Sequence, residues 1–286
     1  MSKIQERAMI VGFHQGKWGA KVKDKEAEAY IKNMYESKGD VGTFSKKLMP
    51  DYVKDINKIY NEAYKFHTES TVPYNDNGER FILNQNYFHY VGRMKEFQSK
   101  ANMKLQEMVG KYTEALEEDK LRMNKGFKPT DYPTVDELQN KYKFFLDVKR
   151  IPENDKLFSD LEADTEEKKK LLEEISAEKE KEFNGKLETA MKTAWKRVYD
   201  VVKHMEKTLS NPDARLHSSV VDNIIELCDI LPQLNITNDP KLEEFRQEVL
   251  QMATAYRVEV LRDSPHYRQE TAKSADDILK KMEGYL

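Results

Sequence analysis

The stretch that decides the fold runs from Asn84 to Met123 and reads NQNYFHYVGRMKEFQSKANMKLQEMVGKYTEALEEDKLRM. Its apolar residues recur at steps of three and four, the pattern of a helix with one buried face. One extra step of four interrupts the heptad, like a stutter that locally relaxes a supercoil. At a rise of ~1.5 Å per residue, a continuous helix here would be about 60 Å long. The seam consists of Tyr87, Tyr90, Met94, Phe97, Ala101, Leu105, Met108, Tyr112 and Ala115.

A second stretch, Thr165–Leu209, predicts another long helix. Its first turns are mostly charged, a pattern typical of a solvated arm, and its second half carries an apolar seam. The Asn211–Asp213 segment ends it, because Pro cannot continue a helix. Two such helices predict a long antiparallel hairpin, a coiled-coil-like arm. The second seam consists of Leu187, Met191, Ala194, Val198, Val201 and Met205.

The segment between these helices predicts a decorated tip. Lys125–Pro129 breaks the first helix. Thr134 then has the position of an N-cap, and Glu137, three residues on, completes a capping box. Lys141–Ile151 is rich in β-formers and predicts a strand that Pro152 ends. Such a strand must pair with the N-terminal β element or with a partner chain.

The residues before the first long helix predict a small β element and two helices. Ala8–His14 and Trp18–Val22 flank a Gly-containing turn, as in a β-hairpin. Helices are expected at Lys25–Ser37 and Asp51–Glu69, and an ordered turn at Val72–Arg80. Along the first helix, one face carries Ala27, Tyr30, Ile31 and Met34; along the second, the stripe is Val53, Ile56, Ile59, Tyr60, Ala63 and Phe66.

The predicted fold is therefore mainly α, with a small β element, a helical base and the long hairpin. Further helices are expected at about Ser218–Leu231, Lys241–Arg262 and Pro265–Gly284. The expected organisation is a base formed by 1–83, a hairpin over 84–210 with a tip insert at 125–163, and C-terminal helices over 211–286 that pack on the base.

The composition fits elongated helices with a thin core. Charged residues make up 35% of the 286 residues and hydrophobic ones 38%, which is more charge than an average globular domain carries. The 12 Phe, 15 Tyr and two Trp argue against a disordered chain. A net charge of −3 excludes a DNA mimic and a wholly basic nucleic-acid coat, but it leaves room for a local basic patch.

Cysteine use and hydropathy predict the compartment. Cys228 is the only cysteine, so no internal disulfide is possible and a reducing cytoplasm is expected. The N-terminal residues contain no apolar run long enough for a signal peptide. No stretch approaches the ~18–20 apolar residues of a membrane span. We expect a soluble cytoplasmic protein that does not contact a membrane.

No residue pattern predicts catalysis, a cofactor or a metal site. Gly12–Trp18 resembles a phosphate loop, but it has three residues between its glycines and Trp after its Lys, so a hairpin turn is expected instead. None of the six histidines forms a zinc-binding spacing, although a metal site assembled only in three dimensions stays open. Cys228 lies in an apolar stretch, which favours a buried, inert thiol over a nucleophile.

The tip is the best candidate for a functional surface. Basic groups with exposed aromatic rings bind single-stranded nucleic acid by charge and stacking. The alternative is a small tip core with buried aromatics, and Glu117–Asp119 partly cancel the charge. Lys120, Arg122, Tyr142, Phe144 and Phe145 accompany the cluster in sequence. The candidate contacts with a partner or with nucleic acid are Lys125, Phe127, Lys128, Tyr132, Lys141, Lys143, Lys149 and Arg150.

Several segments resemble a family of phage and bacterial proteins that is catalogued only as a domain of unknown function. They are Gln15–Asp24 (QGKWGAKVKD), Thr71–Arg80 (TVPYNDNGER), Asp131–Leu138 (DYPTVDEL), Leu209–Asp213 and Leu231–Asn235. The resemblance runs nearly the full chain, but Tyr74 stands where the family more often has Trp. The family brings no assigned activity and no catalytic residues.

The resemblance implies a partner system. Some members of the family are encoded near MoxR-type AAA+ ATPases and von Willebrand A-domain proteins, which implies an adaptor or substrate-side component of a ring ATPase in a bacterial or phage-infected cell. Together with the seams, this predicts a non-enzymatic interaction or assembly protein without a cofactor. Its arm and tip would dock a protein partner or another copy of the chain. The alternative is a nucleic-acid-binding accessory protein that uses the basic, aromatic tip.

Overall fold

The computed structural model describes residues 2–39, 42–152 and 165–286. In these residues the chain is mostly helical and includes a four-stranded sheet, which confirms the expected mixture in this coarse form. It forms two compact units. Unit 1 comprises Met1–Gly12, Thr68–Tyr90 and Asp147–Leu286, and unit 2 comprises Phe13–His67 and Val91–Leu146.

The two long helices exist, but the predicted antiparallel hairpin between them is wrong. The first is not continuous: it divides at Lys111 into α4 (Tyr87–Gly110) and α5 (Tyr112–Met123). The second is α8 (Glu166–Ser210), 45 residues long. The seam of α4 and α5 contributes to the core of unit 2, and the seam of α8 to the core of unit 1. An apolar seam predicts that a helix has a packing partner, but not which one.

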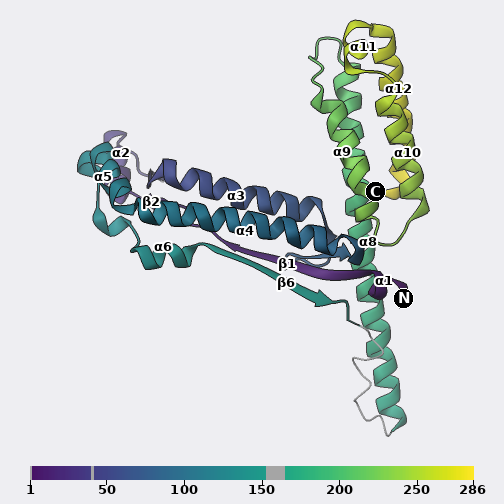
Figure 1. Ribbon diagram of the computed structural model, residues 1–286, viewed down its shortest axis with the longest axis horizontal. Helices are drawn as coiled ribbons and strands as arrows, with labels where there is room; N and C mark the ends of the chain where they lie inside the picture. Colours follow the sequence, from purple (N-terminus) through teal and green to yellow (C-terminus); the bar gives the residue numbers. More distant parts are fainter. Residues whose placement is uncertain (1, 40–41, 153–164) are drawn as a thin grey trace. The chain divides into compact units, whose positions relative to one another are not determined.

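In unit 2, α4 runs beside α3 (Pro50–Glu69), and residues of both helices enter one core (Figure 1). The stripe predicted for α3 is confirmed at its buried positions, which include Val53, Ile56 and Tyr60. Trp18 and Leu138 close the same core from outside the two helices. The other elements of unit 2 are β2 (Lys21–Lys23), α2 (Lys25–Met34), β3 (Ser45–Lys47), the 3-10 helices η2 (Asn124–Gly126) and η3 (Pro129–Asp131), and α6 (Val135–Lys141).

In unit 1, four helices form a closed ring of contacts around one core (Figure 1). They are α8, α9 (Ser219–Leu234), α10 (Pro240–Thr254) and α12 (Pro265–Met282). The helix predicted at Lys241–Arg262 is two helices, because the chain turns after α10 before α11 (Val258–Asp263) begins. Trp195 of α8 is buried in this core, with its ring stacked on that of Tyr285 at 4.5 Å.

The sheet corrects the predicted N-terminal hairpin. Its strand order is β4 (Val72–Pro73), β5 (Glu79–Leu83), β1 (Ala8–Gly16) and β6 (Lys143–Arg150). The strand at Ala8–His14 is confirmed, but it pairs with β5 and β6, whereas β2 pairs with β3. The predicted strand at Lys141–Ile151 therefore pairs within the chain.

Two glycines stand where the backbone of the sheet requires a residue without a side chain. Gly78, with φ of 85°, allows the tight turn between β4 and β5, as the Val72–Arg80 pattern predicts. Gly16 ends β1 where a Cβ would lie 2.9 Å from the carbonyl oxygen of Lys141. Gly16 is therefore required for the approach of the chain that enters β6, and no turn to Trp18–Val22 forms there.

Short helices also occur at both ends of the chain and before α4. They are α1 (Ser2–Arg7) and the 3-10 helices η1 (Asn84–Asn86) and η4 (Glu283–Tyr285). Residues 153–164 of the predicted tip insert lie outside the described residues. Among the residues that the structure does describe, no helix combines the length and the apolar content that crossing a membrane requires.

Candidate functional site

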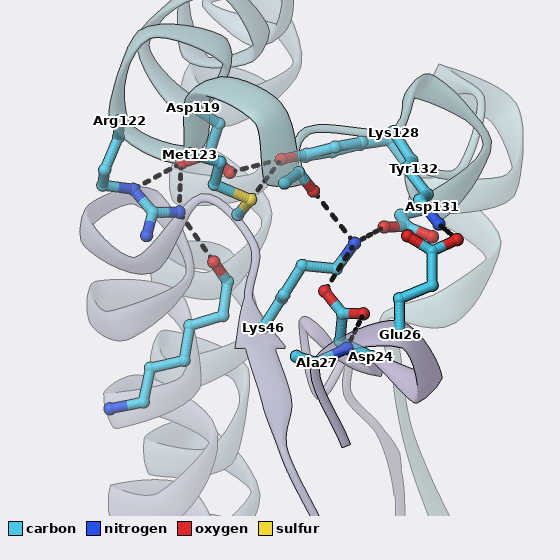
Figure 2. A network of polar contacts seen from close by, with 12 residues as sticks. Asp24, Glu26, Ala27, Lys46, Asp119, Arg122, Met123, Lys128, Asp131 and Tyr132 are labelled. Carbon is cyan, nitrogen blue, oxygen red and sulfur yellow. Dashed lines mark hydrogen bonds and ion pairs between the residues drawn. The ribbon is translucent and has the colours of Figure 1, made fainter. Parts of the chain in front are cut away.

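A network of charged side chains joins the tip of unit 2 to its small two-stranded sheet (Figure 2). Lys46, on β3, is only 9% exposed. Its ammonium nitrogen lies 2.5 Å from a carboxylate oxygen of Asp131 and 3.6 Å from one of Asp24. It also donates a hydrogen bond of 3.0 Å to the carbonyl oxygen of Gly126. One buried cation thereby holds η2, η3 and the start of α2 together.

A third carboxylate, that of Asp119 on α5, organises the other half of the network. One of its oxygens accepts hydrogen bonds from the amide of Met49, at 2.6 Å, and from the hydroxyl of Tyr132, at 2.8 Å. The other accepts from Nε of Arg122 at 2.9 Å. Arg122 also donates to the carbonyl oxygen of Lys47 at 2.6 Å. Asp119 is buried, so these donors replace the water that its charge requires.

The hydrogen bond to Met49 explains how α3 begins. Met49 has φ of 43°, a left-handed conformation that a residue with a side chain rarely adopts. It also precedes Pro50, which restricts its backbone further. The Asp119 carboxylate holds the Met49 amide in this conformation, and α3 starts at the next residue. The network therefore determines where the chain turns into the main helix of unit 2.

The charges of the network shift the pKa values of its members. The amide of Ala27 donates to Asp24 and, with the charge of Lys46, holds the pKa of the Asp24 carboxyl below its ordinary value. Burial, together with the hydrogen bond to Asp119, raises the pKa of Tyr132. Asp24 is also the N-cap of α2, so the same carboxylate starts this helix and binds Lys46.

The structure places the candidate residues of the tip in different surroundings. Tyr132 belongs to the network, and its ring lies 5.3 Å from that of Phe127. Lys128 pairs with Glu26 at 2.6 Å. Lys125, Lys141 and Lys143 are exposed in unit 2, whereas Lys149 and Arg150 belong to unit 1, where Lys149 pairs with Glu79.

The aromatic residues near the tip divide between buried and exposed positions. Tyr142 is buried in the core of unit 2, and Phe144 packs against that core. Phe145 is exposed. The small tip core that the sequence left open as an alternative thus accounts for most of these rings, and few remain for stacking on bases.

An exposed apolar face on α2 is a feature that the sequence reasoning missed. Tyr30 and Met34 are 71% exposed, and Tyr35, just after the helix, is 73% exposed. No residue of α2 is buried. The spacing of Ala27, Tyr30, Ile31 and Met34 is the only signal for this face, and a core-facing stripe has the same spacing. Only the packing distinguishes the two.

No protein-family model, curated protein or solved structure matches this chain. The geometry of the described residues is therefore the basis on which a function is proposed. The two features that bear on it are the charge network of the tip and the exposed face of α2.

Metal binding and thiol reactivity were the other kinds of chemistry that the sequence left to consider. Across residues 2–39, 42–152 and 165–286, no cluster of three or more His, Cys, Asp and Glu side chains could hold a metal ion. Cys228 is buried, as predicted, and burial raises the pKa of its thiol to about 11. Its Sγ lies 3.7 Å from the carbonyl oxygen of Arg246. A thiol with this pKa is protonated at neutral pH and is a poor nucleophile.

Proposed function

We propose that this chain is a non-enzymatic interaction protein that docks a protein partner through the exposed face of α2. The observation that carries the proposal is the exposure of Tyr30, Met34 and Tyr35 on a helix without a buried residue. Burying large apolar side chains is the main source of binding energy between proteins. Aromatic residues and Met are also enriched in such interfaces.

The attachment of α2 supports this role, because a rigid surface loses less entropy on binding. The helix is held at its first turn by Asp24, which caps it and contacts Lys46. Glu26 pairs with Lys128, and the carboxylate of Glu28 accepts a hydrogen bond of 2.9 Å from the amide of Phe44. The charged tip thus anchors α2, while Tyr30 and Met34 on this helix remain exposed.

The residues around the face define the partner. Glu26 and Asn33, four residues before and three residues after Tyr30, place an acidic and a neutral polar group beside this face. Such a polar rim fits a protein groove with an apolar floor and polar edges. The uniform negative charge of a nucleic acid fits it less well. Following the family resemblance, we propose a component of an AAA+ ring-ATPase system as this partner.

The test is affinity purification of the tagged chain from its host, followed by mass spectrometry and with nuclease-treated controls. We expect a stoichiometric protein partner that the variant Tyr30→Ala/Met34→Ser/Tyr35→Ala loses. Phe88→Ala is the matched control, because Phe88 is 84% exposed but lies in unit 1. A partner that the triple variant retains, or recovery of the chain alone, would contradict the proposal. Light scattering on the same samples separates a second copy of the chain from a foreign partner.

The alternative function is nucleic-acid binding at the tip. It rests on Lys125, Lys141 and Lys143, which are exposed in unit 2, and on the exposed ring of Phe145. Binding of this kind weakens steeply with salt. If it occurs, changing the three lysines to Glu should abolish it, while the triple variant of α2 should bind as the wild type does. Absence of binding at low salt would remove this function.

A further inference from the structure

An open pocket of about 350 Å³ lies in unit 1, at the end of the helical ring where α8 stops. Its wall is formed by the loop before α9 and by the region around the start of α12. The lining residues are Ala214, Arg215, Leu216, His217, Arg262 and Arg268. Three are arginines and none is acidic. The pocket on α3 and α4, by contrast, is lined by Asp51, Asp55 and Glu107 together with Lys104.

Arg268 is fixed in this wall by backbone carbonyl groups. Its Nε donates to the carbonyl oxygen of Leu209 at 3.0 Å. One terminal nitrogen donates to the carbonyl oxygens of Thr208, Asn211 and Ala214, at 2.9, 2.7 and 2.8 Å. Two of these acceptors, Thr208 and Leu209, lie in the last turn of α8, whose carbonyl groups have no partner within the helix, and the other two follow it. Carbonyl groups accept hydrogen bonds but carry no net charge, so the positive charge of Arg268 remains.

The other two arginines have N–H groups that make no hydrogen bond within the described residues. Arg262 donates from Nε to the carbonyl oxygen of Leu216, at 2.8 Å, which leaves its terminal nitrogens for another acceptor. Arg215 makes no hydrogen bond or ion pair with any other residue that the structure describes. Asp213 and Asp263 are close in the chain, but within the described residues neither forms an ion pair with these arginines. The pocket therefore combines three guanidinium groups without a neutralising carboxylate.

The start of α9 adds to the positive potential. This helix of 16 residues begins at Ser219, two residues after His217 of the pocket wall. Ser218 makes no side-chain cap, and the amides of Val220 and Val221 donate to the carbonyl oxygens of His217 and Ser218. What α9 offers an anion is therefore the partial positive charge of its N-terminus.

We infer that this pocket binds the phosphate group of a small organic phosphate. A planar guanidinium group pairs with phosphate through two parallel hydrogen bonds, for which Arg215 and Arg262 keep nitrogens that are free within the described residues, while Arg268 contributes its charge. The volume is in the range of pockets for small ligands and exceeds what inorganic phosphate needs. The site is separate from α2 and independent of the partner proposed there.

The experiment is isothermal titration calorimetry of the full chain at constant ionic strength. The probes are inorganic phosphate, ribose 5-phosphate and adenosine 5′-monophosphate, with acetate as the carboxylate. We expect saturable binding of the phosphate probes, with an organic phosphate tighter than inorganic phosphate, and none of acetate. Arg215→Gln should weaken binding about tenfold, since it removes a charged hydrogen-bond donor that no other residue uses.

The control and a second variant keep the result decisive. Arg257→Gln removes the same charge from an exposed position outside the pocket, and it should leave affinity within about twofold, as expected of a screened charge. Arg262→Lys keeps the charge but loses the planar fork, and it should weaken binding several-fold. The inference is overturned if no phosphate probe binds saturably, if acetate competes equally, or if Arg215→Gln and Arg257→Gln behave alike. Circular dichroism confirms that each variant is folded.

Discussion

Lys46 in unit 2 and Arg268 in unit 1 both tie a loop to other parts of their unit, but they do so with different acceptors. Lys46 contacts the carboxylates of Asp131 and Asp24 in addition to one carbonyl. Arg268 contacts four backbone carbonyls, and no carboxylate pairs with it within the described residues. The first arrangement neutralises the cation, whereas the second satisfies its hydrogen bonds and leaves its charge.

This difference separates a structural charge from one that is available to a ligand. A cation paired with buried carboxylates stabilises the fold, and its removal leaves these carboxylates buried without a counter-charge. A cation held by carbonyls keeps a positive potential that attracts an anion. Both units contain one tryptophan in the core, Trp18 in unit 2 and Trp195 in unit 1, so their stabilities can be followed separately.

The largest effect is expected from Lys46→Met. This change leaves Asp24 and Asp131 without their ammonium partner, and both carboxylates are mostly buried. We expect unit 2 to lose about 3 kcal/mol, typical of breaking a buried ion pair from one side. The measurement is urea unfolding followed by Trp18 fluorescence in a Trp195→Phe background. Lys47→Met, at the exposed neighbouring position, should cost less than about 0.5 kcal/mol. Equal midpoints for the two variants would show that the network does not stabilise unit 2.

A smaller loss is expected from Arg268→Met, followed by Trp195 fluorescence in a Trp18→Phe background. The change removes donors to four carbonyls, but water can replace part of them at the end of α8. We expect unit 1 to lose about 2 kcal/mol. Arg257→Met is the control. A loss larger than that of Lys46→Met would mean that charge compensation is not what distinguishes the two sites.

The pH dependence of unit 2 tests the carboxylate side of the comparison. The pKa of Asp24 is lower in the folded chain than in the unfolded chain, so the unfolded chain binds the proton first as pH falls. The contribution of Asp24 is therefore complete well above pH ~4 and is lost as pH falls toward the lower folded pKa. In Asp24→Asn, this part of the acid sensitivity should disappear from unfolding curves measured between pH 5 and 3, about the range of carboxyl titration. An unchanged slope would contradict the role of Asp24.

The smallest effect concerns Cys228, which reports on unit 1 alone. Burial raises the pKa of its thiol to about 11, against about 8.5 for a free cysteine, so little thiolate exists at pH 8. Alkylation at pH 8 should be slow in the wild type and should accelerate in urea. Lys46→Met should leave the rate within about twofold, since a change confined to unit 2 does not open the Cys228 core. Arg268→Met should raise the rate. A rise with Lys46→Met would show that the two units open together.

Much of the secondary structure could be predicted because its signals are local. Thr134 with Glu137 forms the capping box of α6, as the spacing of these residues predicts, and α8 begins directly after Thr165, where the sequence places its start. The burial of Cys228 also follows from its apolar neighbours. These features depend on side chains within a turn or two of one another. The interactions that stabilise them therefore involve residues that are close together in the sequence.

The candidate sites depended on packing that no local signal contains. The face of α2 has the same spacing as a buried stripe, and only the packing of the described residues shows that Tyr30 and Met34 are exposed. The basic and aromatic residues of the tip looked like one surface. Folding instead placed Tyr132 in the charge network and Lys149 in the other unit.

The approximate positions of the helices, their apolar faces and the burial of Cys228 follow from local sequence patterns. Tertiary packing sets which seam lies in which core, which strands flank β1, and which acceptors surround Lys46 and Arg268. The physical reason is that an apolar stripe and a charged side chain each specify what they need, a dry surface or a polar partner. They do not specify which distant segment supplies it, since that depends on how the whole chain packs.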